Sequence, residues 1–272
     1  MISKVNKIAF SLPDTLEEAT TFVDHPFIIY AQKNFLEQKV YDQLVSELVE
    51  SFAKLEFLGS NEKKWFRIES HRKSPKALGE TVVSFCETFS TKEFRKWFIE
   101  THEVFFERGK FASRFPSNRL TMFLTRGLNY VTRTLFGLRL WNIYETSIEM
   151  SLLPEGGSVP PHTDSSQKRM ALVFYTPFKE VSEAMRALWG TEFWRPKDGL
   201  LGETSWHTCT KVGADYEDFS RRHEVFLKIP YEANSICGFI KGDRSWHSVS
   251  PNSLRDDRIA LVINIWDRST KS

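Results

Sequence analysis

The segment Pro160-Pro161-His162-Thr163-Asp164 carries most of what this chain reveals about its architecture. The two prolines favour extended backbone, because proline fixes its own φ and restricts the residue before it. In extended chain, the side chains of His162 and Asp164 lie on the same face. An imidazole and a carboxylate on one face are suitable ligands for a first-row transition metal. The alternative for the pair alone is a polar surface turn at Asp164.

A second histidine, His247, lies between two strand-like segments, residues 234–240 and 258–266. A His-x-Asp pair with a distant histidine is the pattern of the facial triad of two histidines and one carboxylate. This triad binds Fe(II) and leaves coordination positions open. The segment Ser205-Trp206-His207-Thr208 nearly repeats the surroundings of His247 and offers His207 as another distal ligand. No strand beginning with an arginine follows His207, so we prefer His247.

Arg258 begins the second of these strand-like segments. A planar guanidinium binds a carboxylate through two parallel hydrogen bonds. A metal site near such an arginine suits a ligand that chelates the metal at one end and carries a carboxylate at the other, as 2-oxoglutarate does. The alternative is an exposed arginine paired with Asp256 or Asp257, a contact worth only ~0–1 kcal/mol.

The strand that begins at Arg258 is apolar on both faces. If Arg258 points inward, then the alternate residues Ile259, Leu261, Ile263 and Ile265 point outward. An apolar outer face must be covered by other elements. Segments 37–54, 75–90 and 91–108 show apolar residues at helical spacing, and we expect these early helices to form the cover.

Taken together, these segments resemble the 2-oxoglutarate- and Fe(II)-dependent oxygenases of the prolyl-hydroxylase-like type. The resemblance spans roughly residues 25–267. The residues that carry it are, in order, Pro26–Tyr30, Asn34–Leu36, Gly156-Gly157, His162-Thr163-Asp164, Ala171–Tyr175, Asn234–Phe239, His247 and Arg258.

The family's fold implies a mainly β chain with helices (α+β). Its core would be a double-stranded β-helix of the jelly-roll, cupin-like kind, with the N-terminal helices packed on one sheet. The chain would be a single domain over residues 1–272. Residues 1–137 would form a mostly helical support region, and residues 138–268 would form the double-stranded β-helix core.

The family's chemistry implies a 2-oxoglutarate-dependent dioxygenase. Fe(II) would be held by His162, Asp164 and His247, the co-substrate 2-oxoglutarate would be bound by Arg258, and O2 would be the third reactant. Tyr175 is a further candidate for contact with 2-oxoglutarate. The reaction couples decarboxylation of 2-oxoglutarate, which releases succinate and CO2, to oxidation of a substrate. Hydroxylation of a C–H bond is the expected outcome, because Asp164 fills the coordination position that a halide would need.

Two positions depart from the family pattern. Many relatives carry a tyrosine nine residues before the first metal histidine, where this chain has Leu153. Many also carry a serine two residues after the arginine, where this chain has Ala260. Both of those residues can contact 2-oxoglutarate, so its binding here depends on Arg258 and on groups that the sequence does not identify.

Two other kinds of function fit the same residues. One is a non-catalytic protein that binds or senses 2-oxoglutarate or a metal. The other is a Zn(II) hydrolase that uses the same three ligands and a bound water. A hydrolase has no evident need for Arg258, which favours the oxygenase. The substrate, a small molecule or a peptide, and the oligomeric state are not indicated.

Composition indicates one soluble domain. A length of 272 residues suits a single large core. The three cysteines form no CxxC pair and no secretory signal is evident, so we expect a cytoplasmic protein. No apolar run is long enough to cross a membrane. The net charge of +2 makes no demand for a nucleic-acid partner.

Three further expectations concern the surface. Segment 109–139 has basic residues and no acidic one, which predicts a solvated face or, alternatively, a contact with an anionic substrate. Inserted loops around residues 189–211 are expected at the substrate entrance, with residues 190–194 as part of its wall. The histidines expected on the surface are His25, His71, His102 and His223.

Overall fold

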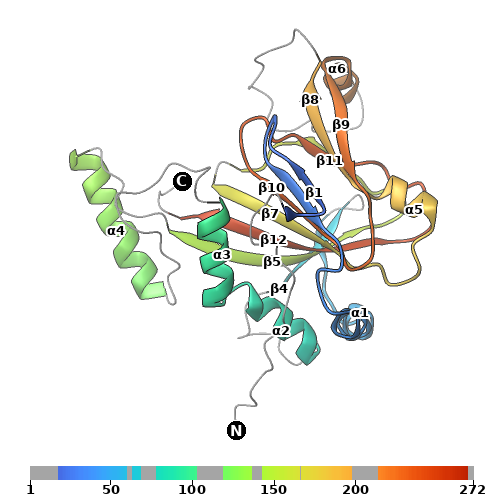
Figure 1. Cartoon of the computed structure of the whole chain (residues 1–272), viewed down its shortest axis with the longest axis horizontal. Coiled ribbons are helices and arrows are strands. Elements are labelled where there is room, and N and C mark those ends of the chain that lie inside the picture. Colours follow the sequence, from blue (N-terminus) through green and yellow to red (C-terminus); the bar gives the residue numbers. More distant parts are fainter. Residues whose placement is uncertain are drawn as a thin grey trace.

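The structure is a computed structural model that describes residues 18–59, 63–68, 78–102, 119–136, 143–165, 167–197 and 214–268. Its centre is formed by two antiparallel sheets (Figure 1). The larger has eight strands in the order β1 (Thr21–Val23), β2 (Ile29–Gln32), β10 (Ile236–Ile240), β7 (Lys168–Tyr175), β12 (Arg258–Asp267), β5 (Tyr144–Leu153), β4 (Lys64–Ile68) and β3 (Leu58–Gly59). The smaller has four strands in the order β6 (Val159–His162), β11 (His247–Val249), β8 (Thr191–Pro196) and β9 (His223–Ile229).

The described helices are α1 (Gln38–Phe52), α2 (Glu80–Thr88), α3 (Lys92–His102), α4 (Arg119–Phe136), α5 (Glu183–Leu188) and α6 (Ala214–Arg222). The first three occur where the apolar spacing of the sequence predicts helices. In α1, Tyr41, Leu44 and Leu48 are buried, and they recur at the helical spacing of three to four residues.

The strand β12 separates two hydrophobic clusters. Ile259, Leu261, Ile263 and Ile265 belong to a cluster that also contains buried side chains of α1, α2 and α3. The ring of Phe85 in α2 stacks on that of Phe174 in β7, with centroids 5.2 Å apart. Burial of each such side chain contributes about 1.5–3 kcal/mol. In Figure 1, α1 and α2 lie below the large sheet.

The second cluster lies between the two sheets. It joins Tyr175, Phe239 and Ala260 of the large sheet to Phe193 and Ile229 of the small one. The rings of Phe193 and Phe239 meet edge to face at 5.4 Å. Of residues 190–194, four lie in β8 and all are buried, with Phe193 paired to His247 in the small sheet, and their part in a substrate wall stays a prediction.

The first half of the chain contributes strands as well as helices. β1, β2, β3 and β4 all come from residues 1–137 and extend the large sheet at both edges. The support region is thus continuous with the sheet it was expected to cover. The division of the chain at residues 137 and 138 stays a prediction.

Two of the four histidines expected on the surface are buried. His102 is fully enclosed between the rings of Trp97 and Phe98. His223 is buried and stacks on Phe219 at 4.0 Å. Aromatic neighbours from the same helix or the adjoining one shield both rings. His25 is exposed as expected, whereas His71 lies outside the described residues.

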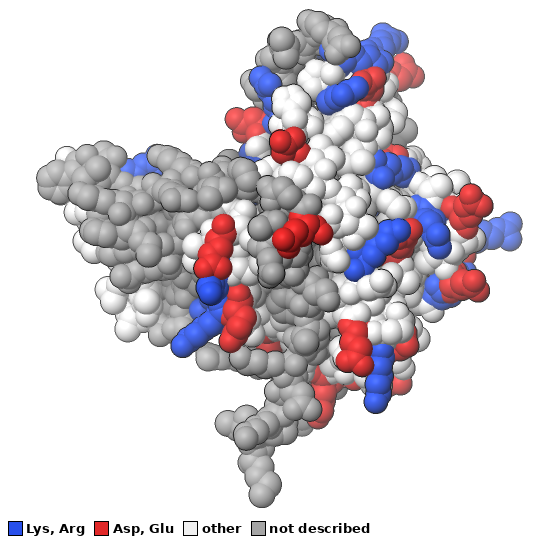
Figure 2. Space-filling view, in the orientation of Figure 1, with Lys and Arg blue, Asp and Glu red and all other residues white. Residues whose placement is uncertain are grey.

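The described part of the basic segment, α4, has an unusual surface. Its exposed face is apolar, with Leu120, Phe123 and Leu135 each more than 60% accessible, whereas Thr125 and Asn129 are buried. The expectation of a solvated face or an anionic-substrate contact for segment 109–139 stays a prediction, because residues 109–118 and 137–139 lie outside the described residues. Elsewhere, on the face shown in Figure 2, basic and acidic side chains alternate over the described surface. Within the described residues, no helix is both long and apolar enough to span a membrane.

Candidate metal centre

The strands β6 and β11 bring the two predicted histidine ligands together. His162 is the last residue of β6 and pairs directly with His247, the first residue of β11. The ring centroids lie 4.2 Å apart. β6 is an edge strand of the small sheet, so Pro160 and Pro161 remove no hydrogen bond that a central strand would need.

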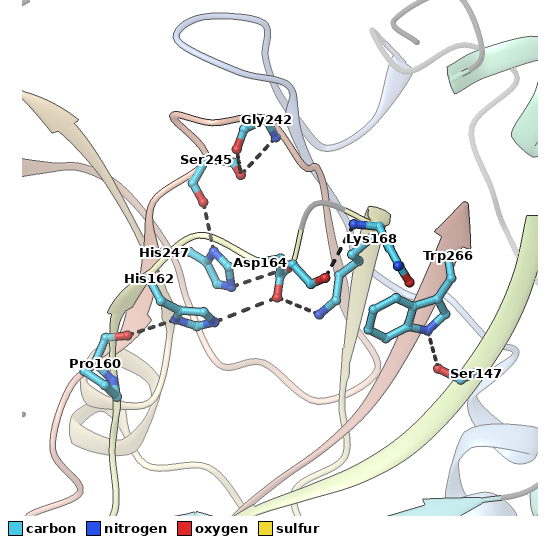
Figure 3. Close-up of polar contacts among 11 residues, drawn as sticks. Ser147, Pro160, His162, Asp164, Lys168, Gly242, Ser245, His247 and Trp266 are labelled. Carbon is cyan, nitrogen blue, oxygen red and sulfur yellow. Dashed lines mark hydrogen bonds and ion pairs between the residues drawn. The ribbon is translucent and has the colours of Figure 1, made fainter. Parts of the chain in front are cut away.

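The backbone fixes the orientation and the tautomer of both rings. Nδ1 of His162 lies 2.9 Å from the carbonyl oxygen of Pro160, and Nδ1 of His247 lies 3.0 Å from that of Ser245 (Figure 3). A carbonyl oxygen only accepts, so each Nδ1 carries the proton and donates it. The lone pair of each imidazole is then on Nε2, and Figure 3 shows both Nε2 atoms directed at Asp164. Metal-binding histidines are commonly oriented in this way.

Asp164 completes the group. Its Oδ1 lies 3.9 Å from Nε2 of His162, and its Oδ2 lies 3.9 Å from Nε2 of His247. These distances are too long for hydrogen bonds. Lys168 donates to Oδ1 at 2.6 Å. The other oxygen, Oδ2, is buried and has no hydrogen-bond partner. A buried carboxylate oxygen without a partner is costly, and a bound cation would satisfy it.

The protonation states suit metal binding. Burial lowers the pKa of His247 to about 3 and also lowers the pKa of His162. Burial acts to raise the pKa of Asp164, but the neighbouring His247 and Lys168 outweigh it and bring this pKa to about 2. At neutral pH the site therefore presents two neutral imidazoles and one carboxylate.

One ligand atom from each of these three residues lies within 4.8 Å of the others. All three side chains are largely shielded from solvent, and Oδ2 of Asp164 is not engaged by a protein hydrogen bond. The donor set of two nitrogens and one oxygen fits a first-row divalent metal with coordination positions left for other ligands. His207 lies outside the described residues, so its competition with His247 is decided only by experiment.

Arg258 is buried rather than exposed, and it forms no surface pair with Asp256 or Asp257. Its Nε donates to the carbonyl oxygen of Trp189 at 2.7 Å. Among the described residues it has no carboxylate within ion-pair distance, and burial lowers its pKa. A buried guanidinium without an anionic partner is unfavourable. The arrangement therefore suits an anionic ligand.

The guanidinium lies beside the paired rings of Tyr175 and Tyr231, with centroids 5.6 and 5.4 Å from its Cζ. The hydroxyl of Tyr175 is within 2.6 Å of Oγ1 of Thr191, and that of Tyr231 donates to the carbonyl oxygen of Ile259. Contact of Tyr175 with a co-substrate stays a prediction. Its observed contacts orient Arg258.

The sequence did not indicate Lys168, Trp189 or Tyr231. Lys168 follows Asp164 by four residues, but only the turn into β7 brings its ammonium group back to the carboxylate. Trp189 contacts Arg258 through its backbone carbonyl oxygen. Every residue type has this group, so the sequence cannot indicate the contact. A cavity of about 220 Å³ borders Trp189 and Ile259, but its lining includes none of the three converging residues.

Comparisons with known proteins support the fold. No family model matches the chain, and no curated protein sequence matches it. Among solved structures, a prolyl hydroxylase from Trichoplax adhaerens, in complex with a hypoxia inducible factor peptide fragment, has a TM-score of 0.50 and 11% identity. The match covers 88% of this chain and 83% of that one. A prolyl 4-hydroxylase from Phytophthora capsici has a TM-score of 0.51 and 10% identity, with 89% of this chain and 60% of that one covered.

A prolyl-4-hydroxylase from Pseudomonas putida matches at 14% identity and a TM-score of 0.48, with 89% of this chain and 94% of that one covered. At such identities, the first two matches establish that the chain has the fold of the prolyl-hydroxylase-like oxygenases. Activity has to be argued from the residues of the site.

Proposed function

We propose that this chain, built on the fold of the prolyl hydroxylases, is an Fe(II)- and 2-oxoglutarate-dependent oxygenase that hydroxylates a C–H bond of a small molecule or peptide. The observation that carries the proposal is the convergence of His162, Asp164 and His247, whose candidate ligand atoms lie within 4.8 Å of one another and include a buried, unpartnered oxygen of Asp164.

The topology supports a double-stranded β-helix core. In chain order, β5, β7, β10 and β12 enter the large sheet, while β6, β8, β9 and β11 form the small one. Eight strands divided four and four between two facing antiparallel sheets match a jelly roll. The candidate site lies at the end of β6 and the start of β11, inside this core.

Each residue has a distinct task in the proposed reaction. His162, Asp164 and His247 would hold Fe(II) and would leave coordination positions for other ligands. Lys168 occupies Oδ1 of Asp164, which directs Oδ2 to the metal. Arg258 binds the distal carboxylate of 2-oxoglutarate through the guanidinium nitrogens that Trp189 does not use. When bound, Fe(II) supplies the redox chemistry that converts 2-oxoglutarate and O2 to succinate and CO2 and oxidises the substrate.

The buried position of Arg258 argues against a Zn(II) hydrolase. Hydrolysis requires a metal-bound water and a base, and a desolvated arginine would lower stability without contributing to either. A non-catalytic 2-oxoglutarate-binding protein would use the same four residues. Only a measurement of turnover distinguishes it from an oxygenase.

The test is an anaerobic titration of the protein with Fe(II) and then 2-oxoglutarate, followed by visible absorption. We expect an absorption band that requires both additions. Exposure to oxygen with candidate substrates should then release succinate. A band without succinate under all conditions would indicate a binding protein, and the absence of any Fe(II) binding would refute the proposal.

A further inference from the structure

Three adjacent strands bring a lysine to the level of Arg258. In the large sheet, Lys64 of β4 pairs with Leu152 of β5, and Leu152 pairs with Ile259 of β12. One step along the sheet, Leu153 pairs with Arg258. The residue that precedes the first residue of β4 would continue this register beside Leu153 and Arg258. That residue is Lys63.

Lys63 directly precedes β4, and continued side-chain alternation would direct it to the inner face of the sheet. Leu152 and Ile259 belong to the cluster under α1–α3, so their row neighbours Leu153 and Arg258 point to the opposite side, between the sheets. Lys63 would then share the row of Leu153 and Arg258. With strands ~4.8 Å apart, its Cα would be about 10 Å from that of Arg258. A lysine side chain and an arginine side chain can both reach a ligand between them.

The electrostatic surroundings of Lys63 agree with this position. Burial lowers its pKa, and the carboxylate of Glu149 acts in the opposite direction. Lys63 also interacts with the charges of Lys168, Asp164 and Arg258, and its charge acts in turn on His162. These interactions agree with the position that the register of β4 indicates for Lys63, between the candidate metal centre and the buried arginine.

The charges around this space favour an anion. Lys63, Lys168 and Arg258 contribute three positive charges, and Glu149 and Asp164 contribute two negative ones. Lys168 is committed to Asp164 at 2.6 Å. Leu153, which lies between Lys63 and Arg258, has no polar group to offer a ligand. An anion bound by Arg258 would therefore find its second charged donor in Lys63.

We propose that Lys63 and Arg258 together bind the distal carboxylate of 2-oxoglutarate, with Lys63 in the role that a side chain at position 153 could have filled. This inference rests on the proposed function. It assigns to the β3–β4 hairpin, far from the metal ligands in sequence, a direct part in co-substrate binding.

The experiment is isothermal titration of the Mn(II)-loaded protein with 2-oxoglutarate and with 2-oxopentanoate, which keeps the metal-chelating end but lacks the distal carboxylate. For Lys63→Met we expect about 10- to 100-fold weaker binding of 2-oxoglutarate. The affinity for 2-oxopentanoate should not change. Lys63→Arg should restore most of the loss. Lys64→Met is the matched control, because Lys64 lies one row away on the opposite face, and it should bind both ligands as the wild type does.

The outcomes separate the two proposals. If the wild type binds neither 2-oxo acid, the proposed function fails. If the wild type binds 2-oxoglutarate and Lys63→Met binds it equally well, the role of Lys63 is refuted while the proposed function stands. Equal weakening of both ligands would place the effect of Lys63 at the metal end and would also refute it. A purely structural ion pair with Glu149 would lower the melting temperature of Lys63→Met without changing its preference between the ligands.

Discussion

At the scale of single residues, the metal centre depends on hydrogen bonds that leave one nitrogen of each histidine free. His247→Ala removes one converging lone pair, and Asp164→Ala removes the buried carboxylate oxygen. Each variant should lose Fe(II) or Mn(II) binding at micromolar metal, because two remaining ligands rarely hold such an ion. Metal content after dialysis, or titration calorimetry with Mn(II), measures this.

The control for this prediction is His207→Ala, which should retain the metal. The opposite result, with iron lost in His207→Ala and kept in His247→Ala, would show that the distal ligand is the other histidine of the two Ser-Trp-His segments.

Arg258 is the residue for which truncation should be most informative. In Arg258→Ala the distal carboxylate of 2-oxoglutarate would lose its charged partner within a buried site. The expected cost is roughly 2–5 kcal/mol, which corresponds to on the order of tenfold to a few thousandfold weaker binding. Metal affinity without the co-substrate should change little. Arg255→Ala, in the exposed loop before β12, should bind 2-oxoglutarate as the wild type does. Equal affinity of Arg258→Ala and wild type would remove the main reason for preferring an oxygenase.

The buried His102 predicts an acid-labile contribution to stability. Burial lowers its pKa from 6.5 to about 3, and its Nε2 is 3.2 Å from the hydroxyl of Tyr30. Between these two values the unfolded chain binds the proton and the folded chain does not. Stability is therefore fully present above pH 6.5 and is lost as the pH falls toward 3. At pH 5 the loss is about 2 kcal/mol. Urea unfolding of the wild type and His102→Gln at pH 7 and pH 5 measures this loss. Between pH 7 and pH 5, the free energy of unfolding of the wild type should fall by about 2 kcal/mol more than that of the variant.

At the scale of elements, the junction of helices and sheet is concentrated at Phe174 of β7. Its ring contacts those of Phe35, Tyr41 and Phe85, with centroids 5.4, 6.0 and 5.2 Å away. Phe174→Ala should lower the free energy of unfolding by about 3–5 kcal/mol, because the cavity cannot close between a sheet and two helices. Phe123→Ala in α4 removes a ring that is 72% exposed and should change stability by less than ~0.5 kcal/mol. Chemical denaturation measures the free energy of unfolding of both variants. Similar losses in Phe174→Ala and Phe123→Ala would contradict the exposed position described for Phe123 in α4.

Elements with strong local patterns are predictable from sequence. The apolar residues on both faces of β12 indicate a strand covered on each side, and the structure places its odd-numbered isoleucines and Leu261 in the cluster with α1–α3. The convergence of His162 and His247 follows from a motif whose spacing has a chemical meaning. Such signals are contained in a few neighbouring residues.

Features set by register between distant strands could not be predicted. The proposed role of Lys63 beside Arg258 depends on the one offset at which β4 pairs with β5, and nothing in Lys63-Lys64 indicates which lysine points inward. The contact between Arg258 and Trp189 uses a backbone carbonyl oxygen, a group that every residue type has. The burial of His102 depends on Tyr30, which is distant in sequence. In each case the deciding partner lies on another element.

At the scale of the whole molecule, the candidate site couples the two sheets. β6 and β11 of the small sheet carry the metal-binding residues, while β12 of the large sheet carries Arg258. A ligand that joins the metal to Arg258 therefore connects the two halves of the core. Because such a ligand binds only the folded chain, it must stabilise the fold by mass action.

Mn(II) with 2-oxoglutarate at about 100 times its dissociation constant should stabilise the protein by about 2.7 kcal/mol. For a chain of this size, that corresponds to a rise in melting temperature of roughly 5–10 °C. Mn(II) with 2-oxopentanoate, which cannot reach Arg258, should give a smaller rise at the same concentration. His247→Ala should show no rise with either ligand, and EDTA should reverse the effect in the wild type. Thermal denaturation followed by circular dichroism measures all of these. Equal shifts with the two 2-oxo acids would mean that the large sheet does not take part in binding, and that the two sheets are not coupled through Arg258.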